Sequence, residues 1–332
     1  MDAYIKAISY YLPPTIVSNE RLVEEFPEWT VEKIAQKVGV NQRHIANDES
    51  VSDMAVKASE KLFKEFPDIK KDDIDFVIIC TQSPDYFLPS TACIVHARLG
   101  LRTQCGAFDF NLGCSGYEYG LAMAKGFIVS GIARNILLVT AEAYNKHIHP
   151  RDKGNRTIFG DAASATVISD NGFARIGEFV LGTDGNGAEN LIVRTGGMVH
   201  PEKMNDTVYD ADGNPRSSDF LYMNGAEIFN FTLKKVPPMV RDTVARNDLD
   251  VEMIDLYVFH QANKFMLNHL RKKLKIAEEK FFINLENVGN TVSSTIPIAL
   301  CDAMKAGVLH GRVLVAGFGV GLSWGATVLY VG

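Results

Sequence analysis

The sequence predicts an α/β fold built from two halves that share one layout. Apolar runs rich in β-branched residues alternate along the chain with stretches of helical periodicity. These runs show little polar alternation, which is typical of strands covered on both faces. A strand, a turn of small residues and a long helix follow one another around residues 108–116 and again around residues 287–294. Together these observations predict layers of helices around a central sheet.

The individual elements follow from the same periodicities. Strands are expected at residues 76–80, 107–112, 135–140, 165–168, 256–260 and 313–318, and helices at residues 52–66, 115–130, 225–245, 264–274 and 294–306. We interpret the repeated layout as a duplication, with an N-terminal half over residues 1–170 and a C-terminal half over residues 171–332. Residues 200–218 are rich in Asp, Asn, Gly and Pro, which predicts a surface excursion over the entrance to a site.

Composition excludes several classes of function. The 332 residues carry a formal net charge of −6, which argues against broad nucleic-acid binding because that needs a basic face. There is no apolar run long enough to span a membrane. The first residues do not have the form of a secretory signal, so a cytoplasmic location is expected.

The five cysteines do not form a metal or disulfide framework. Their spacings are irregular and no CxxC occurs. Cys80, Cys93 and Cys301 have apolar neighbours and are interpreted as core thiols. His147 and His149 lack an acidic or thiol partner at useful spacing, so no metal site is expected.

Cys114 differs from the other cysteines in its surroundings. It follows an apolar strand and Gly113, and it precedes a predicted helix. A thiol at a helix N-terminus faces unpaired N–H groups and the positive end of the helix dipole, which favour the thiolate. Gly113 and Gly116 allow close approach of a substrate. Taken alone, the position also fits a small core residue at a strand end.

Three further motifs carry polar groups at turns. His260 ends a predicted strand, where ligands bind in α/β sheets, and Asn263 can cap the next helix; a hydrogen-bonded core histidine is the alternative. Asn290 follows a glycine, which by itself indicates only a turn. The glycine-rich segment 317–325 exposes backbone N–H groups that could hold an oxyanion or a phosphate, or merely shape a hairpin.

The order of these motifs resembles one enzyme family across almost the whole chain. The segments GVNQRHIA at residues 39–46 and TQSPDYFLPSTA at residues 81–92 come first, followed by the Cys114 turn, residues 160–162, residues 260–263, residues 289–291 and the final glycine turn. Together they resemble β-ketoacyl-acyl carrier protein synthase III, a thiolase-fold condensing enzyme. The resemblance implies duplicated halves that form a five-layered αβαβα sandwich, and a homodimer.

The resemblance also implies a catalytic triad and a ping-pong reaction. The family's Cys, His and Asn match Cys114, His260 and Asn290. Cys114 takes an acyl group from an acyl-coenzyme A, and the backbone N–H groups of Cys114 and Val320 hold the oxyanion. Malonyl-acyl carrier protein then loses CO₂ and attacks the acyl group, as in the initiation of fatty-acid synthesis. No metal and no redox cofactor is implied.

Residues that contact substrate are also implied by position. Lys37 and Lys153 stand where the family has Arg, and the family's adenine-stacking Trp has no match, because Trp29 is expected to lie too far upstream. Leu88 matches a position that reaches the partner subunit's acyl tunnel, which predicts tolerance of branched or medium chains. The remaining positions are Gly225, Asn263, Phe318 and Gly319.

Docking of the acidic carrier protein is expected on one helix. Phe265 stands where the family often has Arg. The nearby cations that could form a basic face are Lys264, Arg271, Lys272 and Lys273. A helix face that merely meets solvent fits the same residues.

Two other functions remain open from the sequence. A same-fold condensing enzyme of specialised biosynthesis, making a polyketide, an alkylquinolone or a hydrocarbon, would show the same motifs. A non-catalytic paralogue that binds carrier protein would be expected to lack a member of the triad, and all three members are present.

Overall fold

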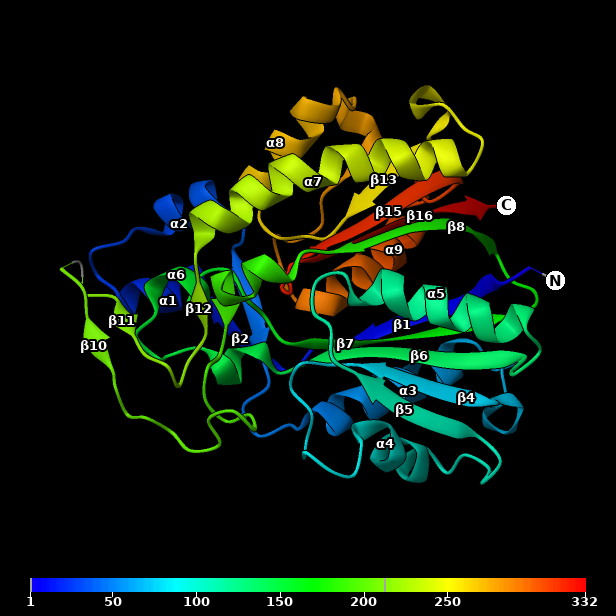
Figure 1. Ribbon diagram of the computed structural model, residues 1–332, viewed down its shortest axis with the longest axis horizontal. Helices are drawn as coiled ribbons and strands as arrows, with labels where there is room; N and C mark the ends of the chain where they lie inside the picture. Colours follow the sequence, from blue (N-terminus) through cyan, green and yellow to red (C-terminus); the bar gives the residue numbers. More distant parts are fainter. Residues whose placement is uncertain (1, 212) are drawn as a thin grey trace.

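The computed structural model describes residues 2–211 and 213–332 and confirms the α/β class. Ten strands are hydrogen-bonded in the order β14-β13-β15-β16-β8-β1-β7-β6-β4-β5. At the middle of this order β8 and β1 pair only through Tyr4↔Arg175 and Ile5↔Ala174. The sheet therefore consists of two five-stranded blocks that are joined at one end and stacked over each other (Figure 1).

The two blocks correspond to the two halves of the chain. The first contains β1 (Tyr4–Tyr11), β4 (Phe76–Cys80), β5 (Gly106–Phe110), β6 (Asn135–Glu142) and β7 (Ala162–Ser169). The second contains β8 (Ala174–Thr183), β13 (Leu256–Phe259), β14 (Phe281–Phe282), β15 (Gly311–Gly319) and β16 (Ser323–Val331). The turn between β7 and β8 separates the strands of the two blocks, and a domain boundary near residue 170 stays a prediction.

Strand directions repeat from one block to the other. In the first block β4 is parallel to β5 and β6, whereas β6–β7 and β7–β1 are antiparallel. In the second block β13 is parallel to β14 and β15, whereas β15–β16 and β16–β8 are antiparallel. The same order and the same directions in both blocks agree with duplicated halves.

Helices complete five layers, as Figure 1 shows. The outer helices α3 (Val51–Glu65) and α4 (Thr91–Leu99) cover the first block, while α7 (Gly225–Arg246) and α8 (Lys264–Leu274) lie on the far side of the second. The central helices α5 (Gly116–Val129) and α9 (Thr295–Lys305) lie between the blocks. Three apolar clusters fill the spaces between layers, which explains why the strands are apolar on both faces.

All the predicted strands and helices are present, with ends shifted by a few residues. The ranges 76–80 and 264–274 match β4 and α8 without a shift. The sequence analysis missed β1, β8, β16 and α4. β1 and β8 are the strands at the junction of the two blocks, so their pairing depends on segments far apart in the chain.

Smaller elements lie beside the layered core. The N-terminal ones are β2 (Thr15–Ser18), α1 (Asn19–Glu25), α2 (Val31–Val38) and β3 (Gln42–Ile45), followed by the short α6 (Lys153–Arg156). The later ones are β9 (Leu191–Ile192), β10 (Val208–Tyr209), β11 (Pro215–Arg216) and β12 (Tyr222–Met223). β10 and β11 form an antiparallel hairpin within the predicted excursion at residues 200–218.

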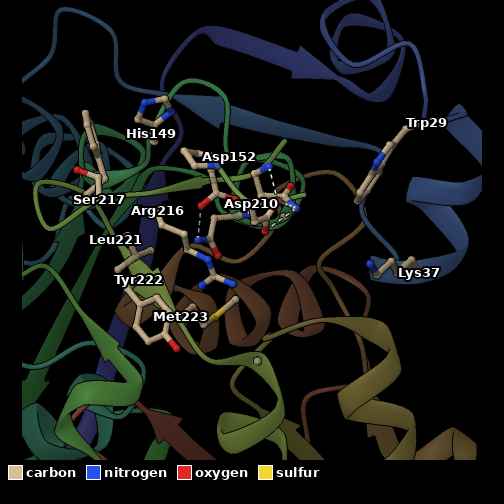
Figure 2. A pocket seen from close by; sticks show the side chains of 16 residues that line it. Trp29, Lys37, His149, Asp152, Asp210, Arg216, Ser217, Leu221, Tyr222 and Met223 are labelled. Atoms are coloured by element: carbon tan, nitrogen blue, oxygen red, sulfur yellow. Dashed lines mark hydrogen bonds between the residues drawn. The ribbon is translucent and has the colours of Figure 1, made fainter. Parts of the chain in front are cut away.

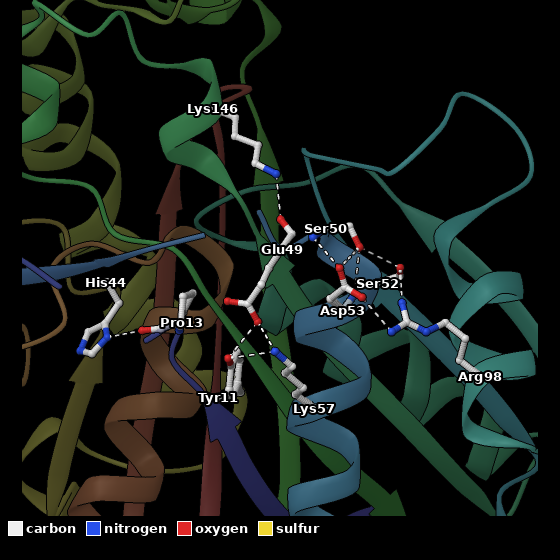
Figure 3. Close-up of polar contacts among 10 residues, drawn as sticks. All are labelled: Tyr11, Pro13, His44, Glu49, Ser50, Ser52, Asp53, Lys57, Arg98 and Lys146. Carbon is white, nitrogen blue, oxygen red and sulfur yellow. Dashed lines mark hydrogen bonds and ion pairs between the residues drawn. The ribbon is translucent and has the colours of Figure 1, made fainter. Parts of the chain in front are cut away.

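Polar contacts fasten the first block to its outer helices (Figure 3). Ser50 caps α3 and forms a capping box with Asp53. Arg98 of α4 pairs with Asp53 at 2.8 Å. Next to the cap, Glu49 accepts a hydrogen bond from Tyr11 of β1 at 2.8 Å, and its backbone oxygen accepts one from Lys146 at 2.8 Å. The start of α3 therefore connects β1, α4 and the segment that follows β6.

The cysteines follow the expected pattern with one exception. Cys80 and Cys301 are buried, as predicted for core thiols, but Cys93 is exposed. Cys93 lies in the first turn of α4, whose buried residues are Thr91, Ala92, Val95 and Leu99. Its apolar neighbours therefore belong to the opposite face of the helix, and the core interpretation of Cys93 is wrong.

Within residues 2–211 and 213–332, no helix has the length and apolar character needed to cross a membrane. The same residues contain no group of three or more His, Cys, Asp or Glu side chains arranged to hold a metal ion.

Candidate active site

Cys114 lies in the turn between β5 and the central helix α5. It is 7% exposed, and Ser115, which caps α5, makes no side-chain hydrogen bond to the helix N-terminus. A Cβ atom on Gly113 would lie 2.6 Å from Val320 Cγ1, and one on Gly116 would lie 2.2 Å from Cys80 Sγ. Both flanking glycines are therefore required by close packing around the thiol.

The glycine turn between β15 and β16 lies directly against this thiol. A Cβ atom on Gly319 would lie 2.7 Å from Cys114 Sγ, and the backbone N–H of the next residue, Val320, acts to lower the pKa of the thiol. The Ser115 and Ser323 hydroxyls are 2.6 Å apart, and Ser323 Oγ donates to the Val320 carbonyl at 2.9 Å. Two buried serines thus hold the turn of the second half against the helix start of the first.

Burial raises the pKa of the Cys114 thiol to about 12. Hydrogen bonds from the backbone N–H groups of Val320 and Cys114 act in the opposite direction but are outweighed. The expected thiolate is therefore wrong for the free protein. Burial removes the water that would stabilise the thiolate. The backbone N–H groups of the helix start and of the glycine turn replace only part of that stabilisation.

His260 follows β13 and is buried. Its Nδ1 lies 2.7 Å from Thr295 Oγ1, and its ring is 5.7 Å from the Phe318 ring in an edge-on arrangement. Burial lowers the pKa of His260 to about 3, so the imidazole is neutral at pH 7. The site therefore contains a neutral imidazole and a neutral thiol.

Asn290 is brought to the same place by the turn before α9. Its Oδ1 accepts a hydrogen bond from Val292 N at 2.9 Å, and its Nδ2 donates to Ala262 O at 3.4 Å. The Ala262 carbonyl lies two residues after His260, so this bond joins the two turns.

Val292 connects all three predicted triad members. Its N–H donates to Asn290 Oδ1 at 2.9 Å, and its carbonyl oxygen accepts at 3.0 Å from Thr295 Oγ1, which lies 2.7 Å from His260 Nδ1. Its Cγ1 would lie 3.2 Å from a Cβ on Gly113, the residue before Cys114. Val292 adopts a positive φ of 55°, which is unusual for a β-branched residue. Such strain is found where surrounding structure fixes a functional turn.

Two buried carboxyl groups near Cys114 were missed by the sequence analysis. Glu142 accepts hydrogen bonds from Gln82 N at 3.1 Å and Ser293 Oγ at 3.1 Å, and burial raises its pKa to about 8. Neither carboxyl oxygen of Glu118 has a hydrogen-bond partner on another described residue, and burial raises its pKa far above the usual range. Burial therefore disfavours the charged form of both acids beside Cys114.

Comparison with known proteins places this arrangement in a family. Residues 108–185 match the family described as 3-oxoacyl-[acyl-carrier-protein (ACP)] synthase III, and residues 244–331 match its C-terminal part. A curated relative, beta-ketoacyl-[acyl-carrier-protein] synthase III of Clostridium perfringens, is 37% identical, covering 99% of both chains. The chain belongs to the synthase III family. It is a thiolase-fold condensing enzyme.

Solved structures of synthase III proteins share the whole fold. A 3-oxoacyl-(acyl-carrier-protein) synthase III crystal structure aligns with a TM-score of 0.96 and 46% identity over 99% of each chain. The 3-oxoacyl-(acyl-carrier protein) synthase from Burkholderia xenovorans aligns with a TM-score of 0.90 and 37% identity, covering 100% of this chain and 95% of that one. The predicted five-layered thiolase-like fold is confirmed.

A surface hollow of about 310 Å³ brings several predicted contact residues together (Figure 2). Lys37 and Gly225 line it, and so does Trp29. Lys37 Nζ lies 5.2 Å from the centre of the Trp29 ring, so the expectation that Trp29 lies too far upstream is wrong. Trp29 lies just before Thr30, the N-cap of α2, and the Nζ atom of Lys33, one turn before Lys37, is 5.3 Å from the centre of the same ring. The Trp29 ring therefore lies beside the helix face that carries both lysines.

The predicted excursion forms another wall of this hollow. Asp210, Asn214, Arg216 and Ser217 line it. Leu221 and Phe220 follow at the base, and Leu221 belongs to the same apolar cluster as Cys114. The excursion therefore borders a surface hollow, and its position over the entrance to a site stays a prediction.

The side chain of Lys153 does not line the hollow at Trp29 and Lys37. Its ammonium pairs with Glu28, and it lines a neighbouring hollow with Arg151 and Tyr209. The reason is local: Asp152 caps α6 with its side chain, and the following Lys153 is turned toward the α1–α2 loop.

The four predicted docking cations do not form one face. Arg271 is turned toward the end of α8, where it meets Glu278 at 3.3 Å, and Lys273 donates to Leu233 O at 2.8 Å. Lys264 and Lys272 are exposed and line a separate hollow beside Phe265. Asn263 caps α8 by accepting from Met266 N at 2.8 Å, as predicted.

Proposed function

We propose that this enzyme condenses an acyl group, carried on Cys114, with malonyl-acyl carrier protein. The observation that carries the proposal is the meeting of Cys114, His260 and Asn290 around Val292, which His260 reaches through Thr295, at the interface between the halves. The curated relatives are named for synthesis of the β-ketoacyl product on acyl carrier protein.

The first step transfers the acyl group. Cys114 Sγ attacks the carbonyl carbon of an acyl-coenzyme A, and the backbone N–H groups of Cys114 and Val320 stabilise the oxyanion. The C–S bond to coenzyme A then breaks, and the thiol proton of Cys114 leaves with the coenzyme A thiol. Because the free thiol is neutral, its proton must move as the donor binds and not before.

The second step makes the carbon–carbon bond. Malonyl-acyl carrier protein loses CO₂, and the enolate oxygen accepts hydrogen bonds from His260 and Asn290. The carbanion attacks the acyl-cysteine, the C–S bond breaks, and Cys114 takes up a proton. The products are CO₂ and a β-ketoacyl-acyl carrier protein. Side chains and backbone groups of this chain carry out every proposed step, so we propose no metal or redox cofactor.

Only one tautomer of His260 suits this role. A neutral imidazole can donate from Nε2 only if Nδ1 carries no proton, and a hydrogen bond donated to Nδ1 favours that tautomer. Thr295 Oγ1 lies within reach of both Nδ1, at 2.7 Å, and Val292 O, at 3.0 Å. In the proposed working state the Thr295 hydroxyl donates a hydrogen bond to Nδ1 in place of Val292 O, and the ring proton lies on Nε2.

The first substrate is assigned from the hollow at Trp29 and Lys37. An indole ring can stack on a purine base, and an ammonium group can meet phosphate. The donor is therefore an acyl-coenzyme A, with Gly225, Phe318 and Gly319 along its path to Cys114. Leu88 favours branched or medium acyl chains in this proposal, and Leu88→Phe should shorten the preferred chain.

The working form in this proposal is a cytoplasmic homodimer. β5 is an edge strand of the described sheet, and Tyr86, Phe87 and Leu88 in the nearby loop are 63%, 77% and 83% exposed. An open edge beside exposed apolar side chains is a common feature of an interface. Light scattering should give twice the mass of the chain, and a monomer would contradict the dimer.

The carrier protein is proposed to dock beside Phe265. Lys264 and Lys272 supply positive charge there for an acidic partner. Replacing both lysines with Ala should raise the KM for malonyl-acyl carrier protein and leave the KM for the acyl donor unchanged.

A single assay tests the function. The protein is incubated with malonyl-acyl carrier protein and a panel of acyl-coenzyme A donors, and protein and products are read by mass spectrometry. We expect an acyl adduct on Cys114 and a β-ketoacyl-carrier product. A condensed product without the carrier would favour the specialised-biosynthesis alternative, and the absence of both adduct and product would contradict catalysis.

A further inference from the structure

The excursion at residues 200–218, here called the cap, is held in place by its own contacts. Asp206 accepts hydrogen bonds from Ser217 Oγ at 3.1 Å and Ser218 N at 2.8 Å. Asp219 accepts from Met204 N and Asn205 N, both at 2.8 Å. The carboxylates therefore fix both strands of the cap without any ligand.

Arg216 is the arginine of the cap whose side chain lines the hollow. It lies on β11, paired with Val208 of β10, and its side chain extends into the space in Figure 2. Its Cζ is 5.4 Å from the centre of the Tyr222 ring, which supports the side chain from one side. Arg216 forms no ion pair with a carboxylate in the described part of the chain.

The acids of the hollow are engaged in their own turns. Asp152 accepts from Asn155 N at 2.9 Å and Asn155 Nδ2 at 2.7 Å. Asp210 accepts from Asn214 N at 2.8 Å. The cations that face the space are Arg216 on the cap and Lys37 on the opposite wall, beside Trp29. A hollow with an aromatic ring and cations on two sides suits a phosphorylated nucleoside.

We infer that Arg216 binds a phosphate group on the nucleotide end of the acyl donor. The inference rests on the proposed function, in which the donor is a coenzyme A thioester. A guanidinium offers a planar pair of N–H donors that matches two phosphate oxygens, which an ammonium cannot do. The cap thereby supplies the contact by which the enzyme distinguishes a nucleotide-bearing donor from a shorter thioester.

Binding is tested with adenosine 3′,5′-bisphosphate by calorimetry, because this probe needs no catalysis. Arg216→Ala should weaken binding about tenfold, the range expected for one charge-assisted bidentate contact, and Arg216→Lys should fall between. Arg194→Ala is the matched control, since Arg194 is an exposed arginine near the cap that pairs with Glu189 and does not line the hollow. Equal binding by wild type and Arg216→Ala would overturn the inference.

Kinetics provide the second measurement. Arg216→Ala should raise the KM for an acyl-coenzyme A about tenfold and leave the KM for the matching acyl-N-acetylcysteamine, which has no nucleotide, unchanged. An equal rise for both donors would overturn the nucleotide contact. If wild type condenses neither donor, the proposed function fails, while the bisphosphate titration still decides whether Arg216 binds phosphate.

Discussion

The two halves of the molecule bring comparable turns to the site but supply opposite chemistry. α5 follows the Cys114 turn, and α9 follows the turn that contains Asn290 and Val292. Neither helix has a side-chain cap at its N-terminus. Burial raises the pKa of Cys114 to about 12 in the first half and lowers that of His260 to about 3 in the second.

This difference shows that one physical cause neutralises both partners. Removal from water disfavours whichever form of a group is charged, so an acid and a base shift in opposite directions. The resting site is therefore a thiol beside a neutral imidazole, not a thiolate beside an imidazolium. In the proposed reaction Cys114 of the first half carries the acyl group and His260 and Asn290 of the second half support decarboxylation, so variants should separate these steps.

The largest effect should come from the nucleophile. Cys114→Ala removes the only atom that carries the acyl group in the proposed reaction, so acyl-enzyme and condensation should be lost, while some malonyl decarboxylation persists. Intact-mass measurement and product analysis check both. Cys93→Ser, which changes an exposed thiol on α4, should keep full activity. An acyl adduct on Cys114→Ala would contradict the assignment.

The second half should show the opposite pattern. His260→Ala and Asn290→Ala should each lower decarboxylation by about 10²-fold or more, because each removes a hydrogen bond to the enolate oxygen. Acylation of Cys114 should continue in both, at a reduced rate. Release of CO₂ from malonyl-acyl carrier protein measures the first effect, and adduct formation the second. Decarboxylation at the wild-type rate in either variant would remove that residue from its role.

Alkylation of the free enzyme tests the neutral thiol. With a pKa of about 12, the thiolate fraction of Cys114 rises about tenfold for each pH unit between pH 7 and 9, so iodoacetamide labelling should rise in proportion. The measurement uses Cys93→Ser to remove the exposed competing thiol. A labelling rate that is already constant from pH 7 would indicate a thiolate and contradict the burial argument.

The smallest effect should come from Thr295. Thr295→Val removes the hydroxyl at Nδ1 and with it the preference for the Nε2–H tautomer of His260. We expect decarboxylation to fall about two- to tenfold with acylation unchanged, since one buried hydrogen bond to a neutral group contributes about 0.5–1.5 kcal/mol. Thr295→Ser should restore most of the rate. Equal losses in both steps would indicate a packing defect instead.

The sequence predicted much of the fold because its strongest signals are local. The apolar runs at β4 and β6 and the periodicity of α8 identify elements without knowledge of their neighbours. β1 and β8 were missed because their role at the junction of the two blocks comes from pairing between distant segments. The exposed position of Cys93 was missed because neighbours in sequence do not tell which face of α4 is buried.

The sequence by itself determined the family, the order of the motifs and the identity of Cys114, His260 and Asn290, since residue types at turns can be read directly. Only the tertiary structure decided their protonation, because a pKa depends on water excluded by residues far away in the chain. It also brought Trp29 beside Lys37, joined Ser115 to Ser323, and placed Arg216 of the cap in the hollow. These contacts depend on packing between segments, which no local pattern of residues specifies.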